Sequence, residues 1–237
     1  MDRSIAASEK ISETIIAIGD IHGCAKTLEA MITRLQAYPE ATFVFLGDYI
    51  DRGPDSYSVI EQLQGFSSTY SCHFLRGNHE QMMLDCFYED QSEHWDQWFL
   101  NGGKQTMDSY TRRATHPLEA PGHADFISQT ELFVETDDFV FVHGGMNPLW
   151  TVQQNLNESD PFDFMWERRH IKEIKPDWEK TVVFGHTPVH EVIMEPHLIA
   201  LDTGCVFVDR GYGTLSAIIL PERELISIKN QETASWV

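Results

Sequence analysis

The stretch TIIAIGDIHG, residues 14–23, joins an apolar run to an aspartate and a histidine two positions apart. The β-branched residues of 14–18 predict a buried strand. Burying Asp20 and His22 at its end costs free energy unless a partner satisfies them. A local hydrogen bond or a metal ion could do so, and the other strand ends decide between the two.

The first 80 residues alternate between strand and helix patterns. Apolar runs predict strands at 14–18, 42–46 and 72–75. Apolar residues spaced as on one helix face predict helices around 28–35, 59–63 (stopping near Gly65) and 82–87. This order predicts a parallel sheet with right-handed crossovers.

The remainder of the chain divides into a helical and a strand-rich part. Tryptophans and loop signals between 89 and about 130 predict an inserted helical cap. Further strands are expected at 139–142, 181–184, 192–194, 198–201, 214–220 and 225–228, with helical segments between 151 and 171. We therefore expect one α/β domain over residues 1–237, built from two mixed β-sheets flanked by helices, with a cap at about 89–130.

Five predicted strands end in glycine combined with aspartate, asparagine or histidine. Ligands bind parallel α/β sheets at the carboxyl ends of the strands. The polar side chains expected at this one rim are Asp20, His22, Asp48, Asn78, His143 and His186. Taken singly, such an aspartate could cap a helix and such a histidine could be packed in the core. Five strand ends of the same kind favour a metal site.

The donor set has oxygen and imidazole groups and no thiolate. It suits Mn²⁺, Fe or Zn²⁺, of which we expect Mn²⁺. Six ligands are too many for one tetrahedral ion and suit two divalent ions that share a carboxylate. Asp48 is the expected bridge because it follows the middle of the first three strands.

Composition excludes several classes of protein and partner. The net charge of −20 repels nucleic acid and anionic membranes, so neither is an expected partner. Acidic solubility or salt adaptation explains this charge better than attraction of a basic protein. We see no membrane span and no signal peptide, and the four separated cysteines are typical of free thiols, so we expect a cytoplasmic protein. The oligomeric state cannot be read from the sequence.

Five motifs occur in a fixed order: GDIHG (19–23), GDYIDRG (47–53), RGNHE (76–80), HGG (143–145) and GHT (185–187). In this order they resemble the phosphoprotein phosphatase family of binuclear metallophosphoesterases. The resemblance implies a calcineurin-like sandwich. IALDTG (199–204) and the short length are similar to bacterial and phage serine/threonine protein phosphatases.

The resemblance also implies a role for each matching residue. Asp20, His22 and Asp48 would hold one metal ion, and Asp48, Asn78, His143 and His186 the other. His79, paired with Asp51, would be the general acid. Arg52 and Arg76 would bind phosphate oxygens, and so would Arg168, although Arg169 is an alternative.

These roles also make chemical sense from the residues themselves. Two ions about 3.5–4 Å apart can bind a bridging hydroxide that attacks phosphorus in line. Arginine forks suit phosphoryl oxygens, and a histidine oriented by a carboxylate can protonate the leaving group. Alternatively, Arg52 and Arg76 form surface ion pairs with Glu80 or Asp55.

Other residues near the motifs have two interpretations each. Asp202 either supports His186 or forms a turn. Three tryptophans could form an aromatic wall at the cleft, although core packing is more usual for Trp95, Trp98 and Trp166. Cys24 beside the metal loop is more readily explained by packing than by redox chemistry.

Three functions follow from these motifs. The first is a metal-dependent phosphomonoesterase, a serine/threonine protein phosphatase with phosphotyrosine as a further substrate, acting on phosphorylated proteins or peptides. The second is a dinucleoside polyphosphate hydrolase, ranked lower because the cap offers few basic residues, namely Lys104, Arg112 and Arg113. The third is a non-catalytic metal- or phosphate-binding module, which would be expected to lack some of these groups.

Overall fold

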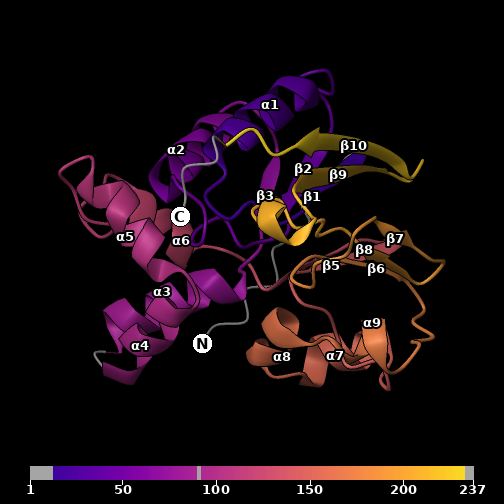
Figure 1. The fold of residues 1–237 in the computed structure, drawn as a ribbon. Coiled ribbons are helices and arrows are strands. Elements are labelled where there is room, and N and C mark those ends of the chain that lie inside the picture. The colour runs from indigo at the N-terminus through magenta and orange to yellow at the C-terminus, as the bar shows by residue number, and fades with distance from the viewer. Residues whose placement is uncertain (1–12, 90–91, 233–237) are drawn as a thin grey trace.

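The computed structural model describes residues 13–89 and 92–232. The start of the chain, where no signal peptide is expected, lies outside these ranges. Two five-stranded sheets pack against each other, with helices on both outer faces (Figure 1). The expected α/β fold with two mixed sheets is confirmed.

The first sheet has the order β10-β9-β1-β2-β3. Its parallel centre consists of β1 (Ile15–Ile18), β2 (Thr42–Phe45) and β3 (Cys72–Phe74), and its antiparallel side consists of β9 (Thr214–Leu220) and β10 (Glu224–Lys229). Crossover helices α1 (Ala25–Leu35) and α2 (Ser56–Ser67) follow β1 and β2. The second helix continues past Gly65, where it was expected to stop, and a Cβ at that glycine would contact nothing within 4 Å.

The second sheet has the order β4-β5-β6-β8-β7. Its parallel centre is β5 (Phe139–Val142), β6 (Thr181–Phe184) and β8 (Leu198–Ala200), and its edges are β4 (Phe133–Glu135) and β7 (Ile193–Met194). Strand β4 was not predicted, because it is a short edge strand in which only Val134 is buried, so it lacks the continuous apolar run of the central strands. Helices α7 (Val152–Glu158), α8 (Pro161–Trp166) and α9 (Arg169–Lys172) lie on the outer side of this sheet, as Figure 1 shows.

Alternate residues of each central strand enter different cores, because successive side chains point to opposite faces of a sheet. Ile15 and Ala17 of β1 lie in the core between the sheets, with Phe141 of β5. Ile16 and Ile18 instead pack against the helices. With both faces covered, the central strands are hydrophobic throughout, which explains their continuous apolar sequences.

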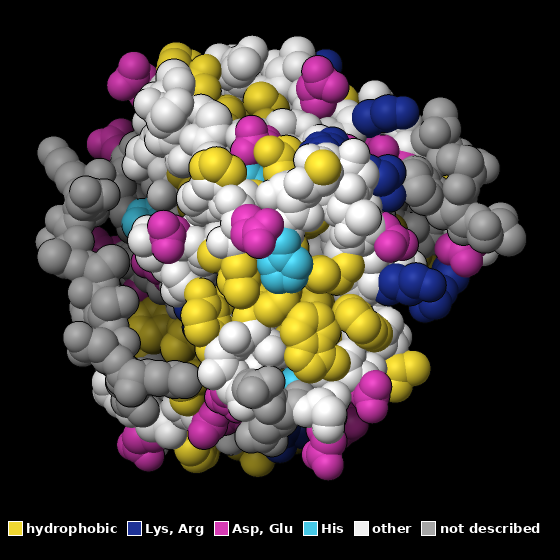
Figure 2. Space-filling view, turned by 90° about the vertical axis from the view of Figure 1, so that its left-hand side faces the viewer, with side chains coloured by type: hydrophobic (Ala, Val, Ile, Leu, Met, Phe, Trp, Pro, Cys, Tyr) yellow, Lys and Arg dark blue, Asp and Glu magenta, His cyan; other side chains and the backbone are white. Residues whose placement is uncertain are grey.

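The cap follows α3 (Asn78–Tyr88) and contains α4 (Ser92–Leu100), α5 (Gly103–Thr111) and α6 (His123–Ser128). Figure 2 views the molecule from the side on which these helices lie, where hydrophobic side chains gather on the surface. Exposed apolar residues of this region include Tyr88, Phe99, Leu100 and Leu118. Among the described residues, no helix is both long and apolar enough to span a bilayer.

Candidate metal centre and active site

The predicted site residues occupy strained loops at the carboxyl ends of the central strands. His22 follows β1, Asp48 follows β2 and His186 follows β6, and all three have positive φ angles (48°, 52° and 63°). Asp51 and Arg52 share this left-handed conformation (70° and 64°). Residues other than glycine adopt it at a cost, and such strain concentrates at functional sites. Five of the predicted residues are therefore held in conformations that suit function rather than stability.

Asp48 lies between two groups of potential metal ligands. The first group is His22, Asp48 and His79, and the second is Asp48, His143 and His186; within each, the ligand atoms lie within 4.8 Å of one another. Asp48 Oδ2 is 3.4 Å from His22 Nε2, and Asp48 Oδ1 is 3.4 Å from His143 Nε2. One carboxylate oxygen thus faces each group, as expected for a carboxylate that bridges two ions.

Backbone carbonyls orient the two histidines that flank Asp48. His22 Nδ1 donates to the Ile50 carbonyl at 2.9 Å, and His143 Nδ1 donates to the Leu46 carbonyl at 2.8 Å. Each Nε2 therefore points at the Asp48 side of the site. A hydrogen bond from the distal nitrogen to a carbonyl is the usual support of a metal-binding histidine.

Asp20 and Asn78 lie beside these groups. Asn78 Oδ1 is 3.1 Å from His143 Nε2, so the second group has an amide oxygen as well. Both oxygens of Asp20 accept from the His186 amide at 3.1 Å. Asp20 is not part of the first group, which includes His79 instead, so metal binding by Asp20 stays a prediction.

Charge in this region is buried and needs compensation. Burial, with the nearby Asp202, raises the pKa of Asp20 well above its usual range. Burial also raises the pKa of Asp48, but His143 and His79 outweigh that effect and hold it well below the usual range. For His143, burial lowers the pKa and the Asp48 carboxylate outweighs it, so that the pKa is about 9. Divalent cations fit this oxygen and imidazole set, because they would neutralise carboxylates that are costly to bury alone.

His79 and Asp51 form a buried pair. His79 Nδ1 lies 2.7 Å from Asp51 Oδ2, and His79 Nε2 has no hydrogen-bond partner in the described part of the chain and lies 4.0 Å from Asp48 Oδ2. Burial raises the pKa of Asp51 to about 8 and lowers the pKa of His79 to about 3. Near neutral pH, Asp51 and His79 together therefore hold one proton that can be given to a leaving group. This is so whether the proton lies on the Asp51 carboxylate or on the His79 ring.

The cap fixes Asp51. Trp98 Nε1 of α4 donates to Asp51 Oδ2 at 2.8 Å, and Thr106 Oγ1 of α5 donates to Asp51 Oδ1 at 2.6 Å. The Trp98 ring is fully buried, so it does not form an aromatic wall at the cleft. It is a core residue that also donates a hydrogen bond to Asp51. Thr106 carried no signal in the sequence because a threonine in a helix pattern is common.

Two of the predicted arginines reach the centre. Arg52 Nη1 lies 2.6 Å from His22 Nε2, and Arg168 Nε lies 2.8 Å from His186 Nε2. Arg169 instead pairs with Glu167. Of these two arginines, only Arg168 contacts a predicted metal ligand, and phosphate binding by either one stays a prediction.

Arg76 does not point toward this centre. Its Nε donates to Thr130 Oγ1 at 3.0 Å, and its Nη2 donates to the Ser128 carbonyl at 2.8 Å, at the end of the cap. Nη1 donates to Gln81 Oε1 at 3.2 Å. In this conformation the guanidinium is committed to protein acceptors, so phosphate binding by Arg76 stays a prediction. Neither Arg52 nor Arg76 forms the alternative ion pair among the described residues, since Asp55 pairs with Arg113 and the Glu80 carboxylate accepts from backbone amides.

Glu80 shapes the loop after β2, a role that the sequence did not reveal. Its carboxylate accepts from the amides of Asp48 (2.8 Å), Tyr49 (2.9 Å) and Gly77 (3.0 Å). Burial and the nearby Asp48 raise its pKa to about 8. Glu80 stands three residues after Gly77, at the position from which a helix glutamate can reach back to the amide of the N-cap residue.

The remaining ambiguous residues take simpler roles. Asp202 Oδ1 accepts from the Gly204 amide at 2.8 Å, which makes it a turn former. Trp95 packs against Phe87 and Trp98, whereas the Trp166 ring lies 5.6 Å from the His186 ring and borders the centre. Cys24 is fully buried.

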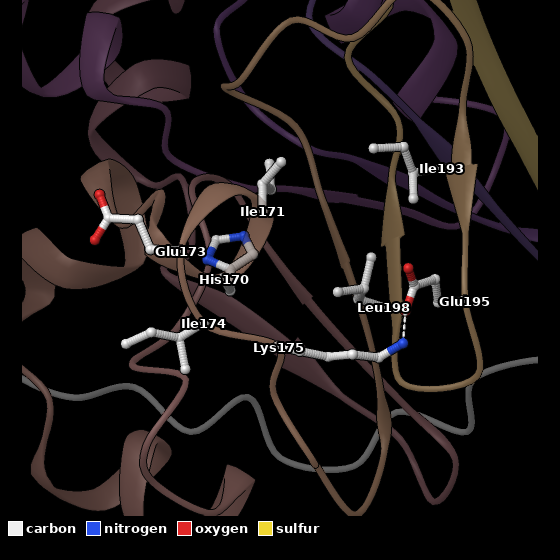
Figure 3. Close-up of a pocket in the computed structure, with 8 residues that line it drawn as sticks. All are labelled: His170, Ile171, Glu173, Ile174, Lys175, Ile193, Glu195 and Leu198. Carbon is white, nitrogen blue, oxygen red and sulfur yellow. Dashed lines mark ion pairs between the residues drawn. The ribbon is translucent and has the colours of Figure 1, made fainter.

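A separate cavity lies between α9 and the β7–β8 edge of the second sheet (Figure 3). It measures about 250 Å³, and none of the predicted ligands or catalytic residues lines it. His170 faces Leu198 across it, and the Lys175–Glu195 ion pair (2.8 Å) lies at its edge. Neither ring nitrogen of His170 is hydrogen-bonded within the described ranges. This cavity is distinct from the metal centre.

Comparisons with known proteins agree with this geometry. The asymmetrical bis(5'-nucleosyl)-tetraphosphatase PrpE of Oceanobacillus iheyensis is 27% identical, covering 91% of this chain and 92% of that protein. Serine/threonine-protein phosphatase 1 of Salmonella typhimurium is 29% identical, covering 80% of this chain and 86% of that protein. A structure of a protein serine/threonine phosphatase from Saccharomyces cerevisiae has the same fold, with a TM-score of 0.62 at 16% identity over 96% of this chain and 83% of that one.

The family model described as calcineurin-like phosphoesterase matches residues 13–211. The matched region contains both ligand groups around Asp48 and the His79–Asp51 pair. With phosphatases among its relatives, the protein is a phosphoester hydrolase. The chain belongs to the calcineurin-like phosphoesterases, within which its motifs are those of the phosphoprotein phosphatase type.

Proposed function

We propose that this enzyme hydrolyses dinucleoside polyphosphates such as diadenosine tetraphosphate. The observation that carries the proposal is the near full-length similarity to the Oceanobacillus tetraphosphatase, which covers more of both proteins than the similarity to the Salmonella protein phosphatase does. On the sequence alone, the protein phosphatase ranked first and the dinucleoside polyphosphate hydrolase second, so the proposal reverses that ranking. The motifs could not distinguish these two activities, because both substrates need the same attack on phosphorus.

The residues of the site divide the work of such a reaction. Asp48 would bridge two divalent ions, with His22 on one side and His143, His186 and Asn78 on the other; Asp20 stands beside the His186 loop. When bound, the ions would supply charge stabilisation and lower the pKa of water. We expect Mn²⁺ in this place, with Fe or Zn²⁺ as alternatives, since the donors do not discriminate strongly among these metals.

The arginines and the buried pair supply the other functions. Arg52 and Arg168 stand at opposite ligand groups, where their forks can hold phosphoryl oxygens from two sides. His79 can pass a proton to the leaving oxygen, and Asp51 fixes the orientation of the ring. A nucleotide leaves as a phosphate, which needs less protonation than the alkoxide of phosphoserine.

A protein phosphatase activity is the second candidate, because the Salmonella relative is a serine/threonine-protein phosphatase. Its substrate would be a phosphorylated protein or peptide. The third expectation, a non-catalytic module, finds no support, because the predicted ligands and the acid pair are all present. In either activity we place the enzyme in the cytoplasm, without nucleic acid or membrane as partner.

The test compares substrates on one enzyme preparation loaded with Mn²⁺. Diadenosine tetraphosphate cleavage is followed by chromatography of the nucleotides, and phosphoserine, phosphothreonine and phosphotyrosine peptides by phosphate release. We expect the highest kcat/KM for the dinucleotide. A higher kcat/KM for a phosphopeptide would overturn the proposal in favour of the second candidate. The nucleotides formed also report the bond attacked: mono- and triphosphate mean asymmetrical cleavage, and two diphosphates mean symmetrical cleavage.

A further inference from the structure

The loop between β8 and β9 brings an aromatic ring and an arginine to the edge of the metal centre. The short helical turn η1 (Val208–Arg210) lies in this loop, shown as the gold turn between the two sheets in Figure 1. The Phe207 ring lies 6.2 Å from the His22 ring. The loop therefore stands directly beside one of the ligand groups.

Two guanidinium groups pack on the same ring. Arg52 Cζ lies 5.2 Å from the Phe207 centroid, and Arg210 Cζ lies 4.8 Å from it. The two guanidinium carbons are therefore at most about 10 Å apart. Because Arg52 also contacts His22, the three side chains form a continuous path from the centre to the surface. We call this path, Arg52–Phe207–Arg210, the arginine track.

The loop holds the outer arginine in place. The Gly213 amide donates to the Gly204 carbonyl at 3.0 Å and closes the loop. Inside it, the amides of Arg210 and Tyr212 both donate to the Phe207 carbonyl, at 3.1 and 3.2 Å. The Tyr212 ring also stacks on His190, with centroids 4.4 Å apart. Arg210 thus starts from a backbone that is fixed by its own hydrogen bonds.

Arg210 also differs from most other described arginines of this acidic chain, because its charge has no partner among residues 13–89 and 92–232. Arg113 and Arg169 form ion pairs, and Arg112 and Arg223 donate to backbone carbonyls. In residues 13–89 and 92–232, the Arg210 guanidinium has no hydrogen bond or ion pair, and its side chain is exposed. An exposed, preorganised cation is free to bind an anion.

We propose that the arginine track binds the polyphosphate chain of the substrate beyond the phosphorus under attack, with Arg210 as a specificity-determining residue. This inference rests on the proposed function and extends it. The phosphoryl group at the centre would face Arg52, and the following phosphates would run along Phe207 toward Arg210. A monoester has no such chain, so Arg210 would favour dinucleoside polyphosphates over phosphoserine. The lower rank of the dinucleotide rested on the few basic residues of the cap, Lys104, Arg112 and Arg113, and did not consider this loop, which lies outside the cap.

Isothermal titration calorimetry on the Mn²⁺-loaded protein, freed of unbound metal, tests the proposal without relying on turnover. The affinity for inorganic tripolyphosphate measures binding along the arginine track. The affinity for orthophosphate, which is expected to reach only the metal centre, is the internal reference. We expect Arg210→Gln to reduce the preference for tripolyphosphate over orthophosphate about fivefold, through loss of a charge-assisted contact at an exposed site. Arg210→Lys keeps the positive charge without the planar guanidinium, so its preference for tripolyphosphate should lie between those of the wild type and Arg210→Gln.

Arg34→Gln is the matched control, because it removes the same charge from an exposed position at the end of α1. It should leave the preference unchanged. An unchanged preference in Arg210→Gln, or an equal drop in Arg34→Gln, would overturn the inference. Failure of the wild type to cleave diadenosine tetraphosphate would overturn the proposed function alone, because the tripolyphosphate preference is measured independently of it.

Discussion

His79 Nδ1 lies 2.7 Å from Asp51 Oδ2, and that same oxygen accepts a hydrogen bond from Trp98 Nε1 at 2.8 Å. His79, the proposed general acid, is therefore linked through one carboxylate to α4, a helix of the cap. If His79 protonates the leaving group, its orientation depends on a segment that belongs to neither sheet.

Replacing the proposed acid should affect poor leaving groups most. We expect His79→Asn to lower kcat about 100-fold on phenyl phosphate, whose leaving oxygen needs a proton, and much less on p-nitrophenyl phosphate. Kinetics on both esters, with metal content measured alongside, check this. Equal losses on the two esters at full metal content would refute the general-acid role.

The hydrogen bond from Trp98 to Asp51 can be removed while an aromatic ring stays in the core of the cap. Trp98→Phe keeps an aromatic ring but leaves Asp51 with one donor fewer, so we expect kcat to fall about fivefold, KM to stay unchanged and the pH–rate profile to shift. The control is Trp95→Phe, which alters the neighbouring ring, 5.7 Å away. A positioning role for Trp98 would be ruled out if both variants kept the wild-type pH profile.

Removing the shared carboxylate should affect both ligand groups together. Asp48→Asn takes a charged oxygen from each, so elemental analysis should find fewer than two metal ions per chain, with activity reduced about 1,000-fold. Asp177→Asn removes an equally charged but fully exposed group and should bind metal like the wild type. Two full equivalents of metal in Asp48→Asn would contradict the bridging role.

The neighbouring arginines of 168–169 should behave differently. Arg168 faces His186, so Arg168→Gln is expected to lower kcat/KM about 100-fold by removing a donor to the phosphoryl group. Arg169 pairs with Glu167, and Arg169→Gln should stay within about twofold of the wild type. Steady-state kinetics on p-nitrophenyl phosphate separates them, and the reverse order would show that the assignment is wrong.

His170 should make the fold sensitive to acid. Burial lowers its pKa from 6.5 to about 4, so the unfolded chain takes up a proton before the folded chain does. The free energy of unfolding should therefore decrease as the pH falls from about 6.5 to about 4, by about 3 kcal/mol for this group.

Denaturant unfolding at pH 7 and pH 4.5 measures this effect. His170→Phe should lose less stability between the two pH values than the wild type does. His94→Gln, which removes a partly exposed histidine of the cap, should match the wild type. The same pH dependence in His170→Phe and wild type would show that His170 is not the source.

Local pattern was enough for much of the fold. The apolar runs at 14–18 and 42–46 became β1 and β2 within one residue, because strands covered on both faces have continuous hydrophobic sequences. Strand β4 and the passage of α2 through Gly65 could not be predicted, since a short edge strand and an exposed glycine depend on what lies around them.

The sequence by itself determined the chemistry of the centre. Glycine next to aspartate, asparagine or histidine at five strand ends implied a two-metal site, because parallel strands bring their carboxyl ends to one edge. Asp48 as the shared carboxylate followed from the order of the strands, and the structure places it between the two ligand groups.

Only the tertiary structure decided which charged side chains face that centre. Arg76 turns to the end of the cap although it belongs to the RGNHE motif, and Arg168, rather than its neighbour Arg169, turns to His186. Arg210 reaches the rim through Phe207, from a loop with no motif of its own. Long, flexible side chains take the partners that folding brings near them, and those partners come from distant parts of the chain.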